Sequence, residues 1–170
     1  MKIINRVQNE LFGELLCFAN DEEQPLFWGK QLKMDFMSEE ENDIIVGLDL
    51  YCYNKELQSR WKPEKVETIV ADIYSQYQIF LNECKGMDDI IMQAIEEEGE
   101  EWDIELVETK EELYSKIQVI QVDILKDSYV VSFALESEEW ALIKKNKNDG
   151  TSYFYINPKN EAEFAQMDYR

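Results

Sequence analysis

The sequence predicts a single α+β domain over residues 1–170, with strands from both ends of the chain in one or two antiparallel sheets. Two or three helices from the middle are expected to pack on one side. Apolar residues alternate with polar ones in the first and last thirds, which is typical of strands. In the middle third they recur every three or four residues, which is typical of amphipathic helices. With 45% hydrophobic residues in 170, the chain has enough apolar side chains for a substantial core.

The first strands are expected over about residues 11–53. Their clearest signal is the stretch Ile44–Cys52, in which every second residue is apolar. Two further strands, 11–18 and Trp28–Phe36, precede it and are joined by a polar turn at Asn20–Pro25. The short links between these strands favour an antiparallel meander.

The helices are expected over about residues 63–117. Pro63 suits a first helical turn, where the N–H that proline lacks would have no partner. An apolar stripe runs from Val66 to Cys84, and a shorter one from Met87 to Ile95. Thr109, with Glu112 three residues later, is a capping-box pattern that opens a last short helix.

The chain is expected to return to strands over about residues 118–157. Ile120–Ile124 and Tyr129–Leu135 alternate on either side of an Asp127-Ser128 turn. Trp140–Ile143 and Tyr153–Ile156 then flank a polar run that ends in Asp149-Gly150, a dipeptide typical of hairpin turns.

The charge of the chain limits the partners it can have. It has 37 acidic and 17 basic residues and no histidine, for a net charge of -20. Nucleic acids and anionic membranes are disfavoured because both are bound through clustered cations. A basic protein would be attracted, and its association would slow as salt screens the charges. Solubility alone is the other interpretation of this charge.

Several kinds of chemistry are absent from the sequence. Without histidine there is no Ser-His-Asp or Cys-His catalytic arrangement and no Cys/His zinc site. The glycines form neither of the two phosphate-binding loop patterns, G-x-x-x-x-G-K-[ST] and G-x-G-x-x-G. Cys52 and Cys84 fall on apolar faces and are expected in the core. We therefore expect no cofactor or metal and, lacking a signal peptide or a long apolar stretch, a cytoplasmic location.

Two acidic segments and two tyrosines are the candidate sites for binding a partner. Glu96–Asp103 is the densest acidic run, and Glu136–Glu139 is a second one. Tyr51 and Tyr53 lie opposite the apolar face of their strand, where aromatic rings could hold lysine or arginine. The predicted partner-binding residues are Glu96, Glu97, Glu98, Glu100, Glu101, Asp103, Glu136, Glu138, Glu139, Tyr51 and Tyr53.

These observations favour a non-enzymatic module that binds a basic protein, such as an immunity protein that masks a cationic toxin or nuclease. Two other functions stay open: a carboxylate-based or metal-assisted enzyme, and a protein that associates with itself. The acidic runs could equally be solvated helix ends and turns. The aromatic residues Phe27, Trp28, Tyr153 and Tyr155 could cover a sheet face instead of forming an exposed surface.

Two short motifs resemble a group of uncharacterised bacterial α+β proteins. Phe12-Gly13-Glu14-Leu15 matches the F-G-x-L opening of that group, and Trp28-Gly29 its W-x-G or W-G second strand. The resemblance covers roughly residues 11–84, with the strand region Tyr129–Trp140 as a further candidate stretch. It implies an α+β fold, and some members lie near toxin–immunity loci, although the group has no established activity. Many members carry a His-Gly step after an acidic stretch, whereas Trp140 follows Glu139 here.

Overall fold

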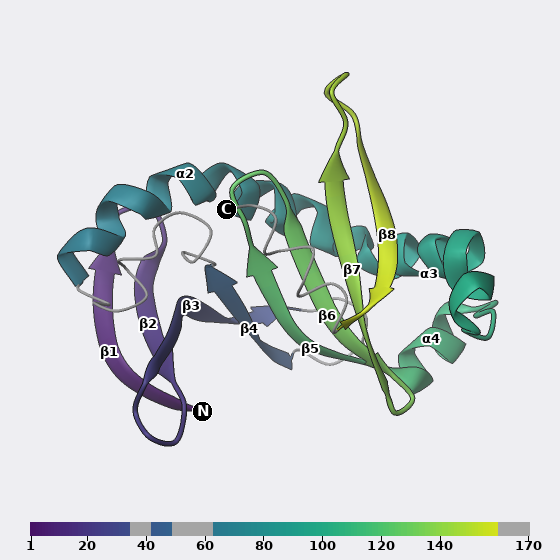
Figure 1. Ribbon diagram of the computed structural model, residues 1–170, viewed down its shortest axis with the longest axis horizontal. Helices are drawn as coiled ribbons and strands as arrows, with labels where there is room; N and C mark the ends of the chain where they lie inside the picture. The colour runs from purple at the N-terminus through teal and green to yellow at the C-terminus, as the bar shows by residue number, and fades with distance from the viewer. Residues whose placement is uncertain (35–41, 49–62, 160–170) are drawn as a thin grey trace.

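The computed structural model describes residues 1–34, 42–48 and 63–159. Its eight strands form one sheet in chain order, and every neighbouring pair is antiparallel except β4 and β5, which are parallel (Figure 1). The strands are β1 (Lys2–Asn9), β2 (Gly13–Ala19), β3 (Pro25–Met34), β4 (Asn42–Leu48), β5 (Ile117–Ile124), β6 (Tyr129–Leu135), β7 (Glu138–Asn146) and β8 (Ser152–Pro158). The predicted α+β class is confirmed.

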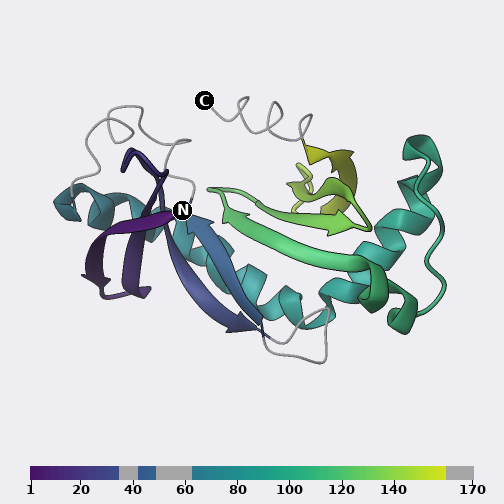
Figure 2. The ribbon, with the colours of Figure 1, turned by 90° about the horizontal axis from the view of Figure 1, so that it is seen from below.

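Helices fill the long connection that the parallel β4–β5 pair requires. They are α2 (Pro63–Glu83), η2 (Cys84–Gly86), α3 (Met87–Glu98), η3 (Gly99–Trp102) and α4 (Lys110–Lys116). The long helix α2 crosses one face of the sheet from the β1 side, and α3 and α4 follow at the end near β8 (Figures 1 and 2). The fold therefore consists of two antiparallel meanders, β1–β4 and β5–β8, joined edge to edge beneath one helical layer.

Local sequence signals explain several element boundaries. Pro63 begins α2 as predicted. The Thr109 side chain accepts a hydrogen bond from the Glu112 N–H at 3.1 Å, so the predicted cap at the start of α4 is confirmed. Gly150, with φ of 85°, lies in the β7–β8 turn, where a left-handed backbone is easiest for glycine.

The first strand differs from the prediction, which began the strands at about residue 11. The structure has an additional strand, β1, at Lys2–Asn9, paired with β2. Its side chains are exposed except for half-buried Val7 and buried Asn9, because β1 is an edge strand. An exposed edge strand has little need for an apolar face, so the alternation that reveals inner strands is missing here.

The main core lies between the sheet and the helices. Trp28, Phe80, Tyr129 and Phe133 are fully buried there, and Cys84 is buried as predicted. Cys52 lies outside the described residues. A smaller cluster, formed by Leu125, Val130, Ala141 and Ile143, is buried on the other face of the sheet. None of the described helices has both the length and the apolar character needed to cross a membrane.

One ion pair is embedded in this core. Lys144 of β7 is paired with Glu83 at the end of α2, and only 7% of the Lys144 side chain is exposed. The Lys144 ammonium lies 5.5 Å from the centre of the Tyr129 ring and 5.8 Å from that of Phe154. The pair fixes the end of α2, and hence the start of α3, over the β7–β8 hairpin.

Candidate functional site

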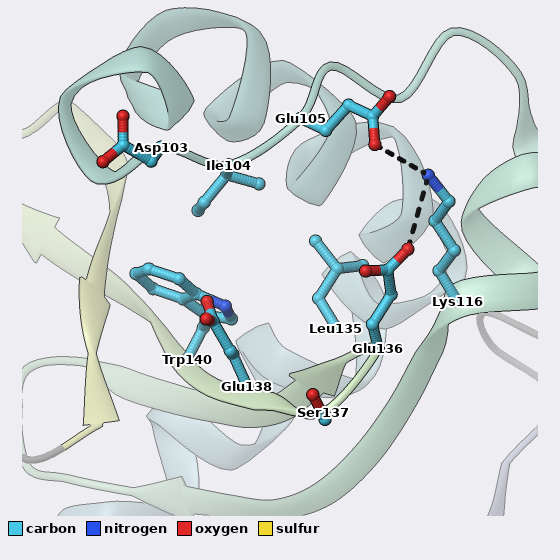
Figure 3. Close-up of a pocket in the computed structure, with 9 residues that line it drawn as sticks. All are labelled: Asp103, Ile104, Glu105, Lys116, Leu135, Glu136, Ser137, Glu138 and Trp140. Carbon is cyan, nitrogen blue, oxygen red and sulfur yellow. Dashed lines mark ion pairs between the residues drawn. The ribbon is translucent and has the colours of Figure 1, made fainter.

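A pocket of about 240 Å³ opens where the loop after η3 faces the β6–β7 turn (Figure 3). Its lining residues are Asp103, Ile104, Glu105, Lys116, Leu135, Glu136, Ser137, Glu138 and Trp140. The two acidic segments singled out in the sequence, 33 or more residues apart, thus meet around one cavity. We call this feature the acidic pocket.

Tight backbone turns present its carboxylates. Glu136 and Ser137 form a two-residue turn between the paired residues Leu135 and Glu138. Glu136 has φ of 60°, and its N–H donates to the Lys116 carbonyl at 2.8 Å. Asp103, with φ of 56°, ends η3 in the same left-handed conformation. Glycine adopts this left-handed conformation freely and asparagine and aspartate tolerate it, so the steric cost falls mainly on Glu136.

Replacing Glu136 by glycine should therefore stabilise the protein. We expect Glu136→Gly to raise the free energy of unfolding by about 0.5–1 kcal/mol, because glycine adopts a positive φ without steric cost. The ion pair lost with Lys116 is long, at 3.8 Å, and exposed, so its loss should offset little of this gain. Urea unfolding of the two proteins measures the difference, and a loss of stability would contradict the explanation.

The charged groups that line the pocket are mostly negative. Four carboxylates line it, with Lys116 as the only amine in the lining. Lys116 contacts Glu112 at 3.1 Å, and Glu105 and Glu136 at 3.8 Å each. The hydrogen bond to Glu112 and the neighbouring carboxylates raise the pKa of Lys116, so it stays protonated. Within the described residues, Asp103 and Glu138 have no ion-pair partner.

The floor of the pocket is apolar. Trp140 and Leu135 are buried members of the main core, and Ile104 packs against that core. The rings of Trp140 and Trp102 lie 6.5 Å apart. A carboxylate rim above an aromatic and aliphatic floor matches a lysine or arginine side chain, whose methylene stem is apolar and whose head is cationic.

A second polar cluster holds α4 in place beside the pocket. Asp88, buried at the start of α3, accepts a hydrogen bond from the Tyr114 hydroxyl at 2.5 Å and lies 3.5 Å from Lys110. Burial raises the pKa of Asp88, but the hydrogen bonds from Tyr114 and the Asp89 amide outweigh it and leave the pKa below its ordinary value. The hydrogen bond to Asp88 raises the pKa of Tyr114 to about 12. This cluster fixes α4, which carries Lys116.

The other predicted acidic residues lie in different places. Glu100, Glu101 and Glu139 are exposed beside the pocket-lining residues, and Lys159 contacts Glu139 at 3.1 Å. Glu96 and Glu97 are exposed on α3. Glu98 is half-buried and accepts a hydrogen bond from the Ile156 N–H of β8 at 2.8 Å, so it holds the sheet edge.

The aromatic residues are mostly covered. Trp28 is buried, while Phe27 and Tyr155 are half-buried and Tyr153 is 44% exposed. The alternative in which these residues cover a sheet face therefore describes all but Tyr153. Tyr51 and Tyr53 lie outside the described residues.

Six lining residues escaped the sequence-based selection: Ile104, Glu105, Lys116, Leu135, Ser137 and Trp140. A signal for Trp140 was present, because the same tripeptide lies within the first acidic segment and spans the end of the second. Glu100-Glu101-Trp102 and Glu138-Glu139-Trp140 each place a tryptophan after two glutamates. In the structure these two tryptophans lie together. Lys116 and Leu135 have no local signal, since only the fold brings them to the pocket.

No cluster able to hold a metal ion occurs among residues 1–34, 42–48 and 63–159. Comparison with protein-family models, curated proteins and solved structures finds no match. The resemblance to the F-G-x-L group stays a prediction.

Proposed function

We propose that this protein is a non-enzymatic binding module that captures a basic protein at the acidic pocket. The observation that carries the proposal is a cavity with four carboxylates in its lining, to which the first acidic segment contributes Asp103 and the second contributes Glu136 and Glu138. The net charge of -20 would draw a cationic partner toward the molecule before contact.

The chemistry of the pocket suggests how the partner is held. An arginine or lysine side chain would lay its stem against Trp140 and Leu135 and direct its charge toward Asp103 and Glu138. These two carboxylates have no ion-pair partner within the described residues, so binding would not first require breaking an ion pair there. Glu100, Glu101 and Glu139 would extend the negative surface around this anchor.

The concrete form of the proposal is an immunity protein that masks a basic toxin or nuclease in the cytoplasm. An inhibitor of this kind presents carboxylates where a nuclease expects phosphates, and it associates quickly at low salt. The pairing of an apolar floor with acids favours a protein partner, since an inorganic cation has no apolar surface to bury against Trp140.

Affinity capture tests the proposal. The immobilised protein is exposed to extract of its native cells, washed at low and then at high salt, and the retained proteins are identified by mass spectrometry. We expect one basic protein that is released as salt rises. A column carrying the double variant Asp103→Asn, Glu138→Gln should retain less of it. The proposal would be contradicted if retention did not change with salt and was equal on the parent and variant columns.

A further inference from the structure

Exposed apolar side chains gather at the β1 edge of the sheet. Met1, Ile3 and Ile4 are 62%, 38% and 39% exposed, and Leu11 in the β1–β2 turn is 43% exposed. They are four of the seven large apolar side chains that are exposed in the described part of the chain. An edge strand with apolar neighbours is a template for pairing with another strand.

The two edges of the sheet are not equivalent. At β8, the Glu98 carboxylate occupies the Ile156 N–H, and α3 packs alongside the strand. At β1, the Arg6 N–H donates to the exposed side chain of its neighbour Asn5 at 2.8 Å, a bond within the strand itself that a pairing strand would have to displace. Asn5–Asn9 pairs regularly with β2, and a bulge interrupts the ladder only between Ile3 and Asn5. Among the described residues, the regular part of β1 pairs with β2 on one side and has no strand partner on the other.

We propose that two copies of this chain pair through β1, antiparallel and about a two-fold axis at Val7. Arg6 and Gln8 are two residues apart, so their backbone N–H and C=O groups point to the same edge of the strand. Arg6 of one copy would exchange backbone hydrogen bonds with Gln8 of the other. This register brings Ile3 of each copy toward Leu11 of the other, which covers two of the four exposed apolar side chains, and it places Ile4 opposite Glu10. The contact is isologous, and it joins the two sheets into one.

The charge pattern of β1 fits a second copy as the occupant. Residues 1–9 contain no acidic residue, although the whole chain carries 37. Arg6 faces Gln8 in the proposed register, so no cation opposes a cation. The copies still repel through their net charge of -20, and salt screens this repulsion. Self-pairing should therefore strengthen with salt, opposite to the capture of a basic partner.

Sedimentation equilibrium over about a hundredfold range of protein concentration, at low and high salt, measures the pairing. We expect a monomer–dimer equilibrium that shifts toward the dimer at high salt. A monomer at every concentration and salt would overturn the proposal without touching the proposed function of the acidic pocket.

Three variants locate the interface. Ile3→Lys removes the apolar contact with Leu11 and should weaken dimerisation about tenfold, whereas Leu106→Lys, at another exposed apolar residue, should leave it unchanged. Asn5→Val frees the Arg6 N–H and should strengthen dimerisation. Val7→Cys places two thiols across the axis, so oxidation should give a disulfide-linked dimer that the parent protein does not form. A dimer that Ile3→Lys leaves intact, or that Val7→Cys fails to cross-link, would overturn the β1 register.

Discussion

Removing the Glu83 carboxylate should cost about 3–5 kcal/mol of the free energy of unfolding, because it leaves the Lys144 ammonium buried without its counter-charge. The nearby Tyr129 and Phe154 rings offer that ammonium some electrostatic compensation, but they do not replace a carboxylate. Urea unfolding of Glu83→Ala against the parent protein measures this loss.

Two comparisons separate the burial of the charge from the loss of a contact. Glu14→Ala breaks the exposed ion pair with Arg6, at 3.0 Å, and should cost less than about 1 kcal/mol. The double variant Glu83→Leu, Lys144→Met removes both buried charges and should regain most of the stability that Glu83→Ala loses. Equal losses for Glu83→Ala and Glu14→Ala would show that Lys144 reaches solvent once it is unpaired.

The second large effect is expected at Gly29, where β3 passes close to β4. A β-carbon added at Gly29 would lie 2.5 Å from the Val46 carbonyl oxygen and 3.3 Å from the Gly47 Cα. Both are backbone atoms of a paired strand and cannot move without distorting the ladder. We expect Gly29→Ala to lower the free energy of unfolding by about 3 kcal/mol, measured by urea or thermal unfolding.

Gly86→Ala is the matched control for this substitution. A β-carbon at Gly86 meets nothing within 4 Å, and the backbone there has no positive φ. The control should change stability by less than about 1 kcal/mol. If Gly29→Ala proved as mild as Gly86→Ala, the close approach of β3 to β4 would be wrong.

Much of the fold was predictable because its signals are local. The turn at Asp149-Gly150, the cap at Thr109 and the helix start at Pro63 depend on a few neighbouring residues, and the structure confirms all three. The edge strand β1 was missed because solvent, not a core, surrounds most of its side chains. The parallel pairing of β4 with β5 joins segments that are separated by the whole helical layer, and no local pattern encodes it.

The candidate site was predictable only in part. The acidic segments are visible in the sequence, but their meeting depends on the position of η3 relative to the β6–β7 turn. Glu98 shows the limit of composition as a guide, because it belongs to the densest acidic run yet bonds to the backbone of β8. The repeated Glu-Glu-Trp tripeptide was the one sequence signal that links the two segments.

The most direct test of the account is the association rate of the captured partner with two charge-matched variants. Asp103→Asn, Glu138→Gln removes two carboxylates from the acidic pocket, while the control Glu22→Gln, Asp127→Asn removes two exposed carboxylates elsewhere. We predict that the pocket variant slows association about tenfold at low salt and that the control stays near the parent rate. Equal rates for the two variants would contradict the account, because only overall charge would then guide the partner.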